Sequence, residues 1–341
     1  MKRCLDLAYL GLGKTYPNPM VGAVIVHQGK IIGEGWHQMA GKAHAEVNAV
    51  ASVKDKSLLK DSTIYINLEP CAHYGKTPPC AELIVKHQIP NVVIGCIDLF
   101  SKVSGKGIEI IEKSGAKVVV GVLEDECIKS HKRFFTFHKK KRPYIILKWA
   151  ETQDGFIAPL EQKIGNPFWI SSPESKKLVH KWRSEEASIL IGTNTAKKDN
   201  PALTVRLWNG NQPLRILIDK NLQLKDSLKV FDDSTKTLVF TEKYNEDSRS
   251  TAFQKVDFSH LTQNLLNELY KRNIHSVIIE GGKETLQSFI DDNLWDEARV
   301  FVGVSKLENG ISAPILNFKP NYKEKVSTDI LSWYLNSNSV I

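Results

Sequence analysis

Apolar runs alternate with helical patterns over the first 140 residues. Residues 21–26 (VGAVIV) and 31–35 flank the turn signal Gln28-Gly29-Lys30 and predict a β-hairpin. Further buried strands are predicted over 63–68, 92–97 and 118–122, and helices over 44–53, 80–88 and 107–114. Strands that alternate with helices in this way predict an α/β domain with a sheet between helices.

A second alternating series begins at residue 144. Strands are predicted over 144–149, 189–191, 215–219, 237–241, 276–280 and 300–304, and helices chiefly over 173–183 and 261–272. The charged run His138-Lys139-Lys140-Lys141-Arg142, closed by Pro143, separates the two series and is typical of a solvated linker. Because 341 residues suit two domains, we expect one domain over 1–140 and another over 144–341.

Composition places the chain among soluble globular proteins. Hydrophobic residues make up 42% and charged residues 25%, and no apolar run approaches the roughly 18 residues that a membrane span needs. The basic pair Lys2-Arg3 is followed by Asp6 rather than by a long apolar core, so we expect no signal peptide and a cytoplasmic protein. The net charge of +8 suits an anionic partner, either a phosphate or a nucleic acid.

Five cysteines stand at positions 4, 71, 80, 96 and 127. An odd number in a long chain without an export signal argues against a disulfide framework. We therefore expect these cysteines to bind metal or to be buried.

One cluster has the composition of a zinc site. His44 opens a predicted helix, Cys71 follows a predicted strand, and Cys80 opens the next helix behind Pro78-Pro79. One imidazole and two thiolates are ligand types that select zinc. Three protein ligands leave a fourth position for water, whose pKa zinc lowers to about 7.

Glu46 has a separate role in this cluster. Residues two apart on a regular helix point in nearly opposite directions, so His44 and Glu46 can face one site only from a first helical turn. There Glu46 would move protons from the water to a leaving ammonia without ligating zinc, as the glutamate of zinc deaminases does. The alternative is a structural zinc site with His73 or His37 as a fourth ligand.

Three segments make a family resemblance specific. Residues 17–24 (PNPMVGAV), 44–46 (HAE) and 68–80 (LEPCAHYGKTPPC) resemble the bifunctional riboflavin-biosynthesis deaminase/reductase family. Other base deaminases carry Pro-Cys-x-x-Cys, whereas eight residues separate the two cysteines here. The resemblance implies a cytidine-deaminase-like three-layer α/β/α domain that hydrolyses an amino group from a pyrimidine ribosylamine 5′-phosphate.

The same resemblance implies the residues that hold this first substrate. They are Asn18 for the pyrimidine, His73 and Lys76 for the ribose phosphate, and Asp98 in a further contact loop. Phe100 stands in that loop where the family has asparagine.

The resemblance continues into the second domain. Residues 147–155 (LKWAETQDG), 199–206 (DNPALTVR) and 279–286 (IEGGKETL) resemble the reductase half, whose α/β fold is similar to dihydrofolate reductase. The Gly281-Gly282 pair between a strand and a helix allows the backbone to approach a phosphate closely. Reduction of a ribose aldehyde or imine to a ribityl chain needs a hydride donor, and NADPH fits that need.

Roles in the second domain follow from the resemblance. Arg183, Leu203, Arg206 and Glu280 would hold the substrate, with Arg206 on its phosphate. Contacts to NADPH would come from Glu151, Trp169, Thr195, Asp199, Gly281, Gly282, Lys283, Glu284, Thr285 and Leu286, and Lys220 could face its 2′-phosphate. Lys148 is a candidate proton donor, and Pro167 stands where the family has a serine hydroxyl.

We therefore predict a two-domain enzyme that first deaminates and then reduces phosphorylated small-molecule substrates, with one zinc per chain. We expect it to bind neither nucleic acid nor membrane, and the sequence does not decide whether it forms a homo-oligomer. One alternative is a nucleic-acid base deaminase with an RNA-binding second domain, which predicts Pro-Cys-x-x-Cys spacing and clustered basic and aromatic residues beyond 144. Another is a member in which one domain only supports the other.

Overall fold

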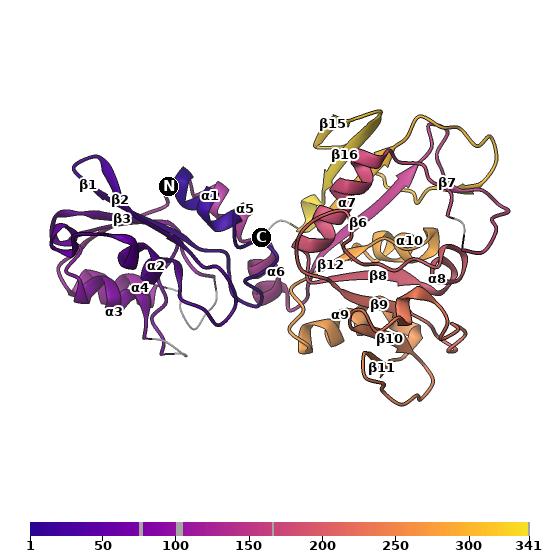
Figure 1. Ribbon diagram of the computed structural model, residues 1–341, viewed down its shortest axis with the longest axis horizontal. Helices are drawn as coiled ribbons and strands as arrows, with labels where there is room; N and C mark the ends of the chain where they lie inside the picture. The colour runs from indigo at the N-terminus through magenta and orange to yellow at the C-terminus, as the bar shows by residue number, and fades with distance from the viewer. Residues whose placement is uncertain (75–77, 100–104, 166, 340–341) are drawn as a thin grey trace. The chain divides into compact units, whose positions relative to one another are not determined.

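The computed structural model describes residues 1–74, 78–99, 105–165 and 167–339 (Figure 1). Its contacts divide the chain into two compact units, Met1–Lys141 and Arg142–Val340. Each unit has its own sheet and its own apolar clusters, and each is described by itself below.

The first unit is built on a five-stranded mixed sheet. Its strands are β1 (Gly22–His27), β2 (Lys30–Trp36), β3 (Thr63–Leu68), β4 (Asn91–Cys96) and β5 (Lys117–Val120), in the order β2-β1-β3-β4-β5. Strand β1 is antiparallel to both β2 and β3, which confirms the predicted hairpin, whereas β3, β4 and β5 are parallel. The parallel strands bring their carboxyl ends, and the residues that follow them, to one edge of the sheet.

Helices cover both faces of this sheet (Figure 1). Helices α2 (Ala45–Ser52), α3 (Cys80–Lys86) and α4 (Lys106–Lys113) lie on one side, and α1 (Lys2–Tyr9), α5 (Glu124–Ser130) and α6 (Lys132–Lys140) belong to the other. Apolar residues on the first side include Ile64, Ile66 and Ile84, and those on the second include Leu5 and Phe135. The unit therefore has the predicted three layers.

The cysteines outside the predicted zinc site are part of this core. Cys4, Cys96 and Cys127 are free thiols, each at most 1% exposed. Burial raises the pKa of Cys4 to about 12 and that of Cys127 to about 11. These thiols are protonated, packed and unreactive at neutral pH. They therefore fulfil the expectation of burial, the alternative to metal binding.

The prediction of a linker over 138–142 is wrong for its first three residues. His138, Lys139 and Lys140 form the last turn of α6, and Lys141, with a φ of 56°, is the residue that caps the end of the helix. Phe135 and Phe137 of the same helix are buried, and their packing stabilises α6. In the sequence, the charged residues at the end of this helix hide its apolar side. Basic residues in a last turn also interact favourably with the helix dipole.

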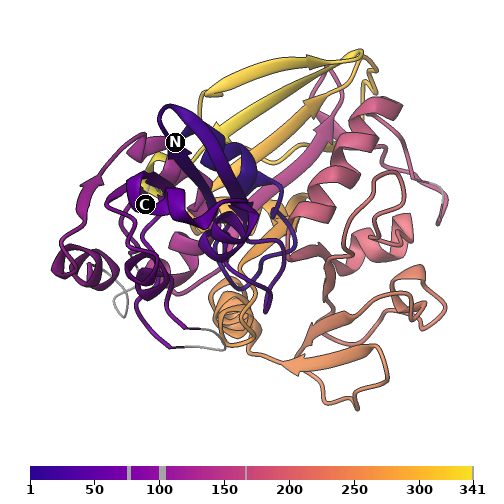
Figure 2. The same cartoon turned by 60° about the vertical axis from the view of Figure 1, so that its left-hand side comes forward.

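The second unit holds a nine-stranded sheet. Its strands are β6 (Tyr144–Glu151), β8 (Ser188–Gly192), β9 (Leu214–Ile218), β10 (Thr237–Thr241), β11 (Thr251–Lys255), β12 (Ser276–Ile279), β13 (Glu297–Val302), β15 (Tyr322–Val326) and β16 (Asp329–Leu335), in the order β11-β10-β9-β8-β12-β6-β13-β16-β15. The first seven in that order are parallel, and β16 and β15 extend the sheet as an antiparallel ribbon, yellow in Figure 2. A separate pair joins β7 (Phe156–Ala158) to β14 (Ile311–Ser312).

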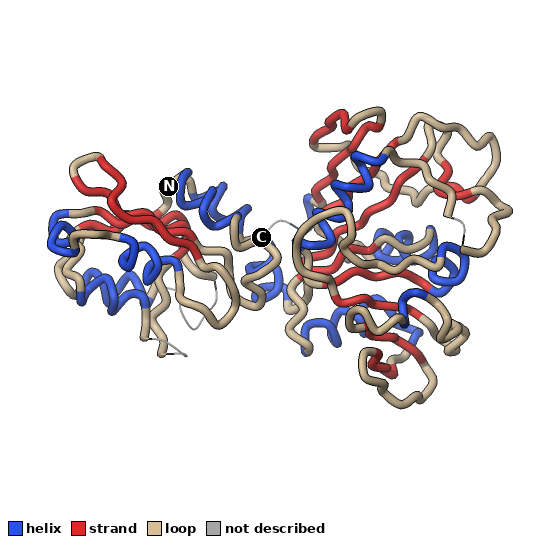
Figure 3. The backbone as a smooth tube through the Cα atoms, in the orientation of Figure 1, coloured by secondary structure: helices blue, strands red, loops and turns tan. Residues whose placement is uncertain are grey.

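Both faces of this sheet are also covered by helices (Figure 3). Helices α7 (Pro173–Glu185) and α8 (Thr193–Asp199) lie on one face, and α9 (Leu261–Lys271) and α10 (Lys283–Asp291) lie on the other. Successive side chains of β12 point to opposite faces of the sheet, and those of Val277, Ile278 and Ile279 are apolar, so both faces need a cover. Val277 and Ile279 pack with α9 and α10, whereas Ile278 packs with α7. In the part of the chain that the structure describes, no helix is both long enough and apolar enough to cross a bilayer.

Candidate functional site

Three side chains from separate elements of the first unit converge on one point. His44 is the N-cap residue of α2, Cys80 is the first residue of α3, and Cys71 follows the end of β3. The His44 Nδ1 atom lies 3.6 Å from Cys71 Sγ and 3.4 Å from Cys80 Sγ. All three ligand atoms lie within 4.8 Å of one another, and no other such group of His, Cys, Asp or Glu occurs among the described residues.

The protonation of these groups suits a cation. The Cys71 sulfur accepts hydrogen bonds from the Cys80 thiol and from His44, and these bonds lower the pKa of Cys71 although burial opposes the shift. The Cys80 backbone N–H also donates to Cys71 Sγ over 3.3 Å. A ready thiolate beside a second thiol and an imidazole is a donor set that fits zinc.

Glu46 lies beside this cluster, outside the group of ligand atoms. Glu46 is 3% exposed, and it lies in the first turn of α2, two residues after His44, as predicted. Burial raises the pKa of its carboxyl above the usual range, and the negative charge of Cys71 adds to the shift. Such a carboxyl accepts and releases a proton more readily near neutral pH than an exposed one does.

Asn18 contacts His37, whose ring centroid lies 5.4 Å from that of His44. The Asn18 Nδ2 atom lies 3.1 Å from His37 Nε2, and His37 Nδ1 lies 3.0 Å from the backbone oxygen of Ala43. His37 therefore donates from Nδ1 and accepts from Asn18 at Nε2, which leaves the Asn18 carbonyl oxygen for another partner. Neither His37 nor the exposed His73 belongs to the ligand group, so neither completes a structural zinc site in this geometry.

Asp98 is buried after the end of β4, and a residue that the sequence did not single out holds its backbone. The buried Glu69 carboxylate accepts hydrogen bonds from the backbone N–H groups of Asp98, Gly105 and Gly107 at 3.0 to 3.3 Å. These bonds link the segment before Cys71 to the segment that contains Asp98. Lys76 and Phe100 lie outside the described residues.

The second unit contains a cavity of about 1170 Å³. Thirteen of the residues predicted for reduction line it, from β6, α7, α8, α10 and the loops that join them: Lys148, Trp169, Arg183, Thr195, Asp199, Leu203, Arg206, Glu280, Gly282, Lys283, Glu284, Thr285 and Leu286. Pro167 lines it as well. Cavities of this size hold substrates or cofactors.

A charged triad occupies one wall of the cavity. Arg183 donates two hydrogen bonds to the Glu280 carboxylate, at 3.0 and 2.7 Å, and Lys148 Nζ lies 3.9 Å from Glu280. Burial disfavours the ionised Glu280 carboxyl, but the charges of Arg183 and Lys148 outweigh burial and lower its pKa to about 2. Burial lowers the pKa of Lys148, and the repulsion from Arg183 acts in the same direction against the attraction of Glu280.

The predicted glycine pair has two functions rather than one. A Cβ on Gly281 would lie 2.4 Å from Ile191 Cα, so this glycine lets the turn pack against the end of β8. Gly282 lines the cavity, has a φ of 60° and is the N-cap residue of α10. Gly192 caps α8 in the same cavity, so two helix N-termini offer free N–H groups to an anion.

Three predicted residues lie outside the cavity lining. Gly281 packs as described, and Glu151 accepts a hydrogen bond over 2.7 Å from Nε1 of Trp149, which itself lines the cavity. Lys220 follows the end of β9, where its Nζ lies 3.4 Å from the Glu242 carboxylate. His180 lines the cavity without having been predicted, and no local sequence pattern distinguishes it from a core histidine.

Comparison with known protein families agrees with the two units. Residues 1–96 match the family model of the cytidine and deoxycytidylate deaminase zinc-binding region, and residues 143–305 match the RibD C-terminal domain. The chain is 41% identical over 318 residues to the riboflavin biosynthesis protein RibD of Aquifex aeolicus, which covers 92% of this chain and 88% of the relative. It is 33% identical over 323 residues to RibD of Escherichia coli, with coverages of 89% and 86%.

Solved structures agree over the whole chain. A diaminohydroxyphosphoribosylaminopyrimidine deaminase/5-amino-6-(5-phosphoribosylamino)uracil reductase from Thermotoga maritima is 36% identical, has a TM-score of 0.90, and covers 98% of this chain and 97% of its own. Acinetobacter baumannii RibD is 29% identical with a TM-score of 0.87 and the same coverages.

Proposed function

Because the chain belongs to the RibD family of riboflavin biosynthesis proteins, we propose that its two candidate sites divide the two reactions of the family between the two units. The chain is a bifunctional enzyme of riboflavin biosynthesis, a zinc-dependent deaminase and an NADPH-dependent reductase. One observation carries this assignment of the two reactions. The group of His44, Cys71 and Cys80, with the buried Glu46 beside it, lies wholly within the first unit. The RNA-binding alternative loses its support, because residues 143–305 match the RibD C-terminal domain.

Deamination takes place in the first unit in this proposal. Its substrate is 2,5-diamino-6-ribosylamino-4(3H)-pyrimidinone 5′-phosphate, and water replaces one amino group, which leaves as ammonia. His44, Cys71 and Cys80 would hold a zinc ion, which when bound would lower the pKa of a water molecule toward neutral and so make it a better nucleophile. Glu46 takes the proton of the water and passes it to the leaving nitrogen. Asn18 binds the pyrimidine through its free carbonyl oxygen, and Asp98, His73 and Lys76 contribute further substrate contacts.

Reduction takes place in the second unit. Its substrate is 5-amino-6-(5-phosphoribosylamino)uracil, whose ribose unit opens before the hydride adds to its C1′ carbon. The residues that line the cavity would hold NADPH, which when bound would supply this hydride. Lys148 supplies the proton that the reduced group needs, and Glu280 keeps Lys148 and Arg183 in place. Arg206 binds the substrate phosphate, for which a guanidinium is well suited.

Lys220 should favour NADPH over NADH. Replacing Lys220 by alanine should raise the KM for NADPH several-fold and leave the KM for NADH nearly unchanged, because only NADPH carries the 2′-phosphate. Steady-state kinetics of reduction with each cofactor checks this. The matched change Glu242→Gln removes the carboxylate that pairs with Lys220 and should lower the KM for NADPH. Equal effects of Lys220→Ala on both cofactors would remove Lys220 from the site.

The division between the units can be tested by cutting the chain. The boundary that fits the structure lies between Lys141 and Arg142, since a cut before Lys140 would remove part of α6. Residues 1–141 should deaminate and residues 142–341 should reduce substrate that is already deaminated, each at a rate near that of the intact chain. Circular dichroism shows whether each fragment is folded, and zinc content provides a second check for the first fragment. Folded fragments without their own reaction would show that one unit completes the site of the other.

We further propose a cytoplasmic location and small-molecule partners only. Both substrates are soluble phosphorylated metabolites, and NADPH is a soluble cofactor. The net charge of +8 suits these anions at both sites without a nucleic acid.

A further inference from the structure

Residues 200–206 form an extended segment, called the strap here, that contains no helix or strand. Five of its seven residues line the cavity, Leu203 and Arg206 among them. Two of its residues, Asn200 and Leu203, have positive φ values of 43° and 53°. Because buried backbone groups outside regular structure still need partners, the partners of the strap decide where Arg206 lies.

Side chains from three other elements provide these partners. Gln212 accepts a hydrogen bond from the Val205 N–H over 2.7 Å and donates one to the Val205 carbonyl over 3.0 Å. The Arg206 N–H donates to His180 Nδ1 over 3.1 Å. The backbone is thus fixed at Arg206 and at the residue before it, and Arg206 lines the cavity.

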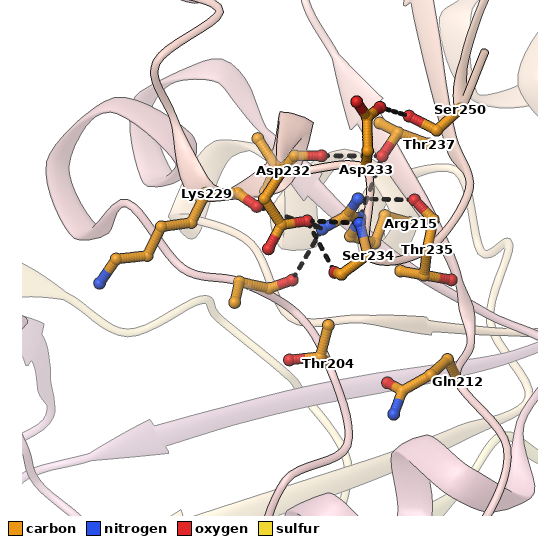
Figure 4. A network of polar contacts seen from close by, with 12 residues as sticks. Thr204, Gln212, Arg215, Lys229, Asp232, Asp233, Ser234, Thr235, Thr237 and Ser250 are labelled. Carbon is orange, nitrogen blue, oxygen red and sulfur yellow. Dashed lines mark hydrogen bonds and ion pairs between the residues drawn. The ribbon is translucent and has the colours of Figure 1, made fainter.

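The other end of the strap is fixed by a buried arginine (Figure 4). Arg215 of β9 is fully buried and bonds to the Asp232 carboxylate over 2.8 Å and to the carbonyl oxygens of Lys229 and Thr235. Its Nη1 atom also lies 3.4 Å from the carbonyl oxygen of Ala202. This network supports the strap near Ala202, four residues before Arg206, so it does not explain the placement of Arg206 itself.

His180 is suited to this task by its position and its protonation. It lies one helical turn before Arg183 on α7, lines the cavity, and is 6% exposed. Burial, together with the charges of Arg183 and Arg206, lowers the pKa of His180 to about 4. The ring is therefore neutral at pH 7, and its Nδ1 lone pair can accept the Arg206 N–H.

Arg206 itself is free to bind an anion. Its Nη1 atom donates to Thr204 Oγ1 over 2.8 Å, and among the described residues its guanidinium has no carboxylate partner. Burial lowers the pKa of Arg206, and the positive charge of Arg183 adds to the shift. An incoming phosphate would relieve this repulsion between the two cations.

We propose that His180 is a positioning residue for reduction, which fixes the backbone of Arg206 and so sets the preference of the cavity for a phosphorylated substrate. The inference rests on the proposed role of Arg206 in binding the phosphate. His180 acts through Arg206 and does not touch the substrate. A purely structural histidine would affect folding or kcat, but it would not affect the recognition of one phosphate group.

The test compares the phosphorylated reduction substrate with its dephosphorylated form. His180→Leu removes the acceptor and should raise the KM for the phosphorylated substrate about tenfold, with kcat changed by less than about twofold and with no effect on the dephosphorylated form. His180→Asn places an oxygen near the position of Nδ1 and should restore most of the affinity. In an Arg206→Ala background, His180→Leu should have no further effect, because the residues act in series.

Ser175→Ala is the matched control. It removes a buried hydrogen bond to Asp329 from the same helix without touching the strap, and it should leave the phosphate preference unchanged. Additive effects of His180→Leu and Arg206→Ala, or an equal rise in KM for both substrates, would overturn the inference. If Arg206→Ala alone leaves the phosphate preference intact, the proposed role of Arg206 fails instead, and the two failures are thus distinguished.

Discussion

Replacing Glu46 by glutamine should lower kcat for deamination by about 100- to 10,000-fold, the contribution expected of a general acid–base group. Glutamine keeps the size of the side chain and can still hydrogen-bond, but it cannot take a proton from water or deliver one to ammonia. Because Glu46 lies outside the ligand group, zinc should stay bound at one ion per chain. Steady-state deamination kinetics and elemental analysis of the variant check both statements.

Reduction provides the internal control for this variant. Glu46→Gln should reduce already deaminated substrate at the rate of the unchanged protein, since the cavity belongs to the other unit. Loss of zinc from the variant would make Glu46 a ligand and contradict the role given to it. Deamination at an unchanged rate would exclude it from proton transfer.

Replacing Lys148 by glutamine should lower kcat for reduction by about 100-fold or more, with deamination unaffected. The reason is the loss of the proton donor, and Lys148→Arg should be almost as inactive, because arginine keeps the charge but does not release a proton near neutral pH. Thermal unfolding should show that both variants are folded. The half-buried Lys181, which pairs with Glu185 outside the cavity lining, offers a matched control in Lys181→Gln.

The pH dependence of reduction should carry the same signature. A lysine that donates a proton works in its protonated form, so kcat should fall as pH rises past the pKa of Lys148. Burial lowers this pKa, so the fall should begin at a lower pH than for an exposed lysine. The alkaline limb should be absent from Lys148→Gln. If the alkaline limb persists in this variant, it reports the titration of another group and not of Lys148.

Periodicity and spacing were sufficient for most of the fold and for the metal cluster. The alternation of strands and helices predicted all five strands of the first sheet, and in the second sheet β6, β8, β9, β10, β12 and β13, because buried parallel strands are short continuous apolar runs. Strands β11, β15 and β16 were missed. The pair His44 and Glu46 could be placed at a helix start because only a first turn brings both toward one site. Helix α6 was missed because its charged last turn resembles a linker, and its apolar side faces the core.

The supporting residues could not be predicted, for a physical reason. Glu69, His180 and Arg215 each bond to backbone groups of segments distant in the sequence, and such bonds leave no periodic signal. Their side-chain types are common on solvated surfaces, so nothing local separates a buried clamp from an exposed charge. Lys220 shows the converse limit, since its place after β9 was predicted but its ion pair with Glu242 was not.

The central claim is that the zinc site and the reduction cavity are two separate active sites, and removal of zinc tests it most directly. Both reactions would be assayed separately on the intact protein before chelation, on the metal-free protein, and after one equivalent of zinc is returned. Deamination should vanish without zinc and return with it, while NADPH-dependent reduction of already deaminated substrate stays constant throughout. Deamination by the metal-free protein, or a reduction rate that falls and recovers with zinc in a protein that remains folded, would contradict the account.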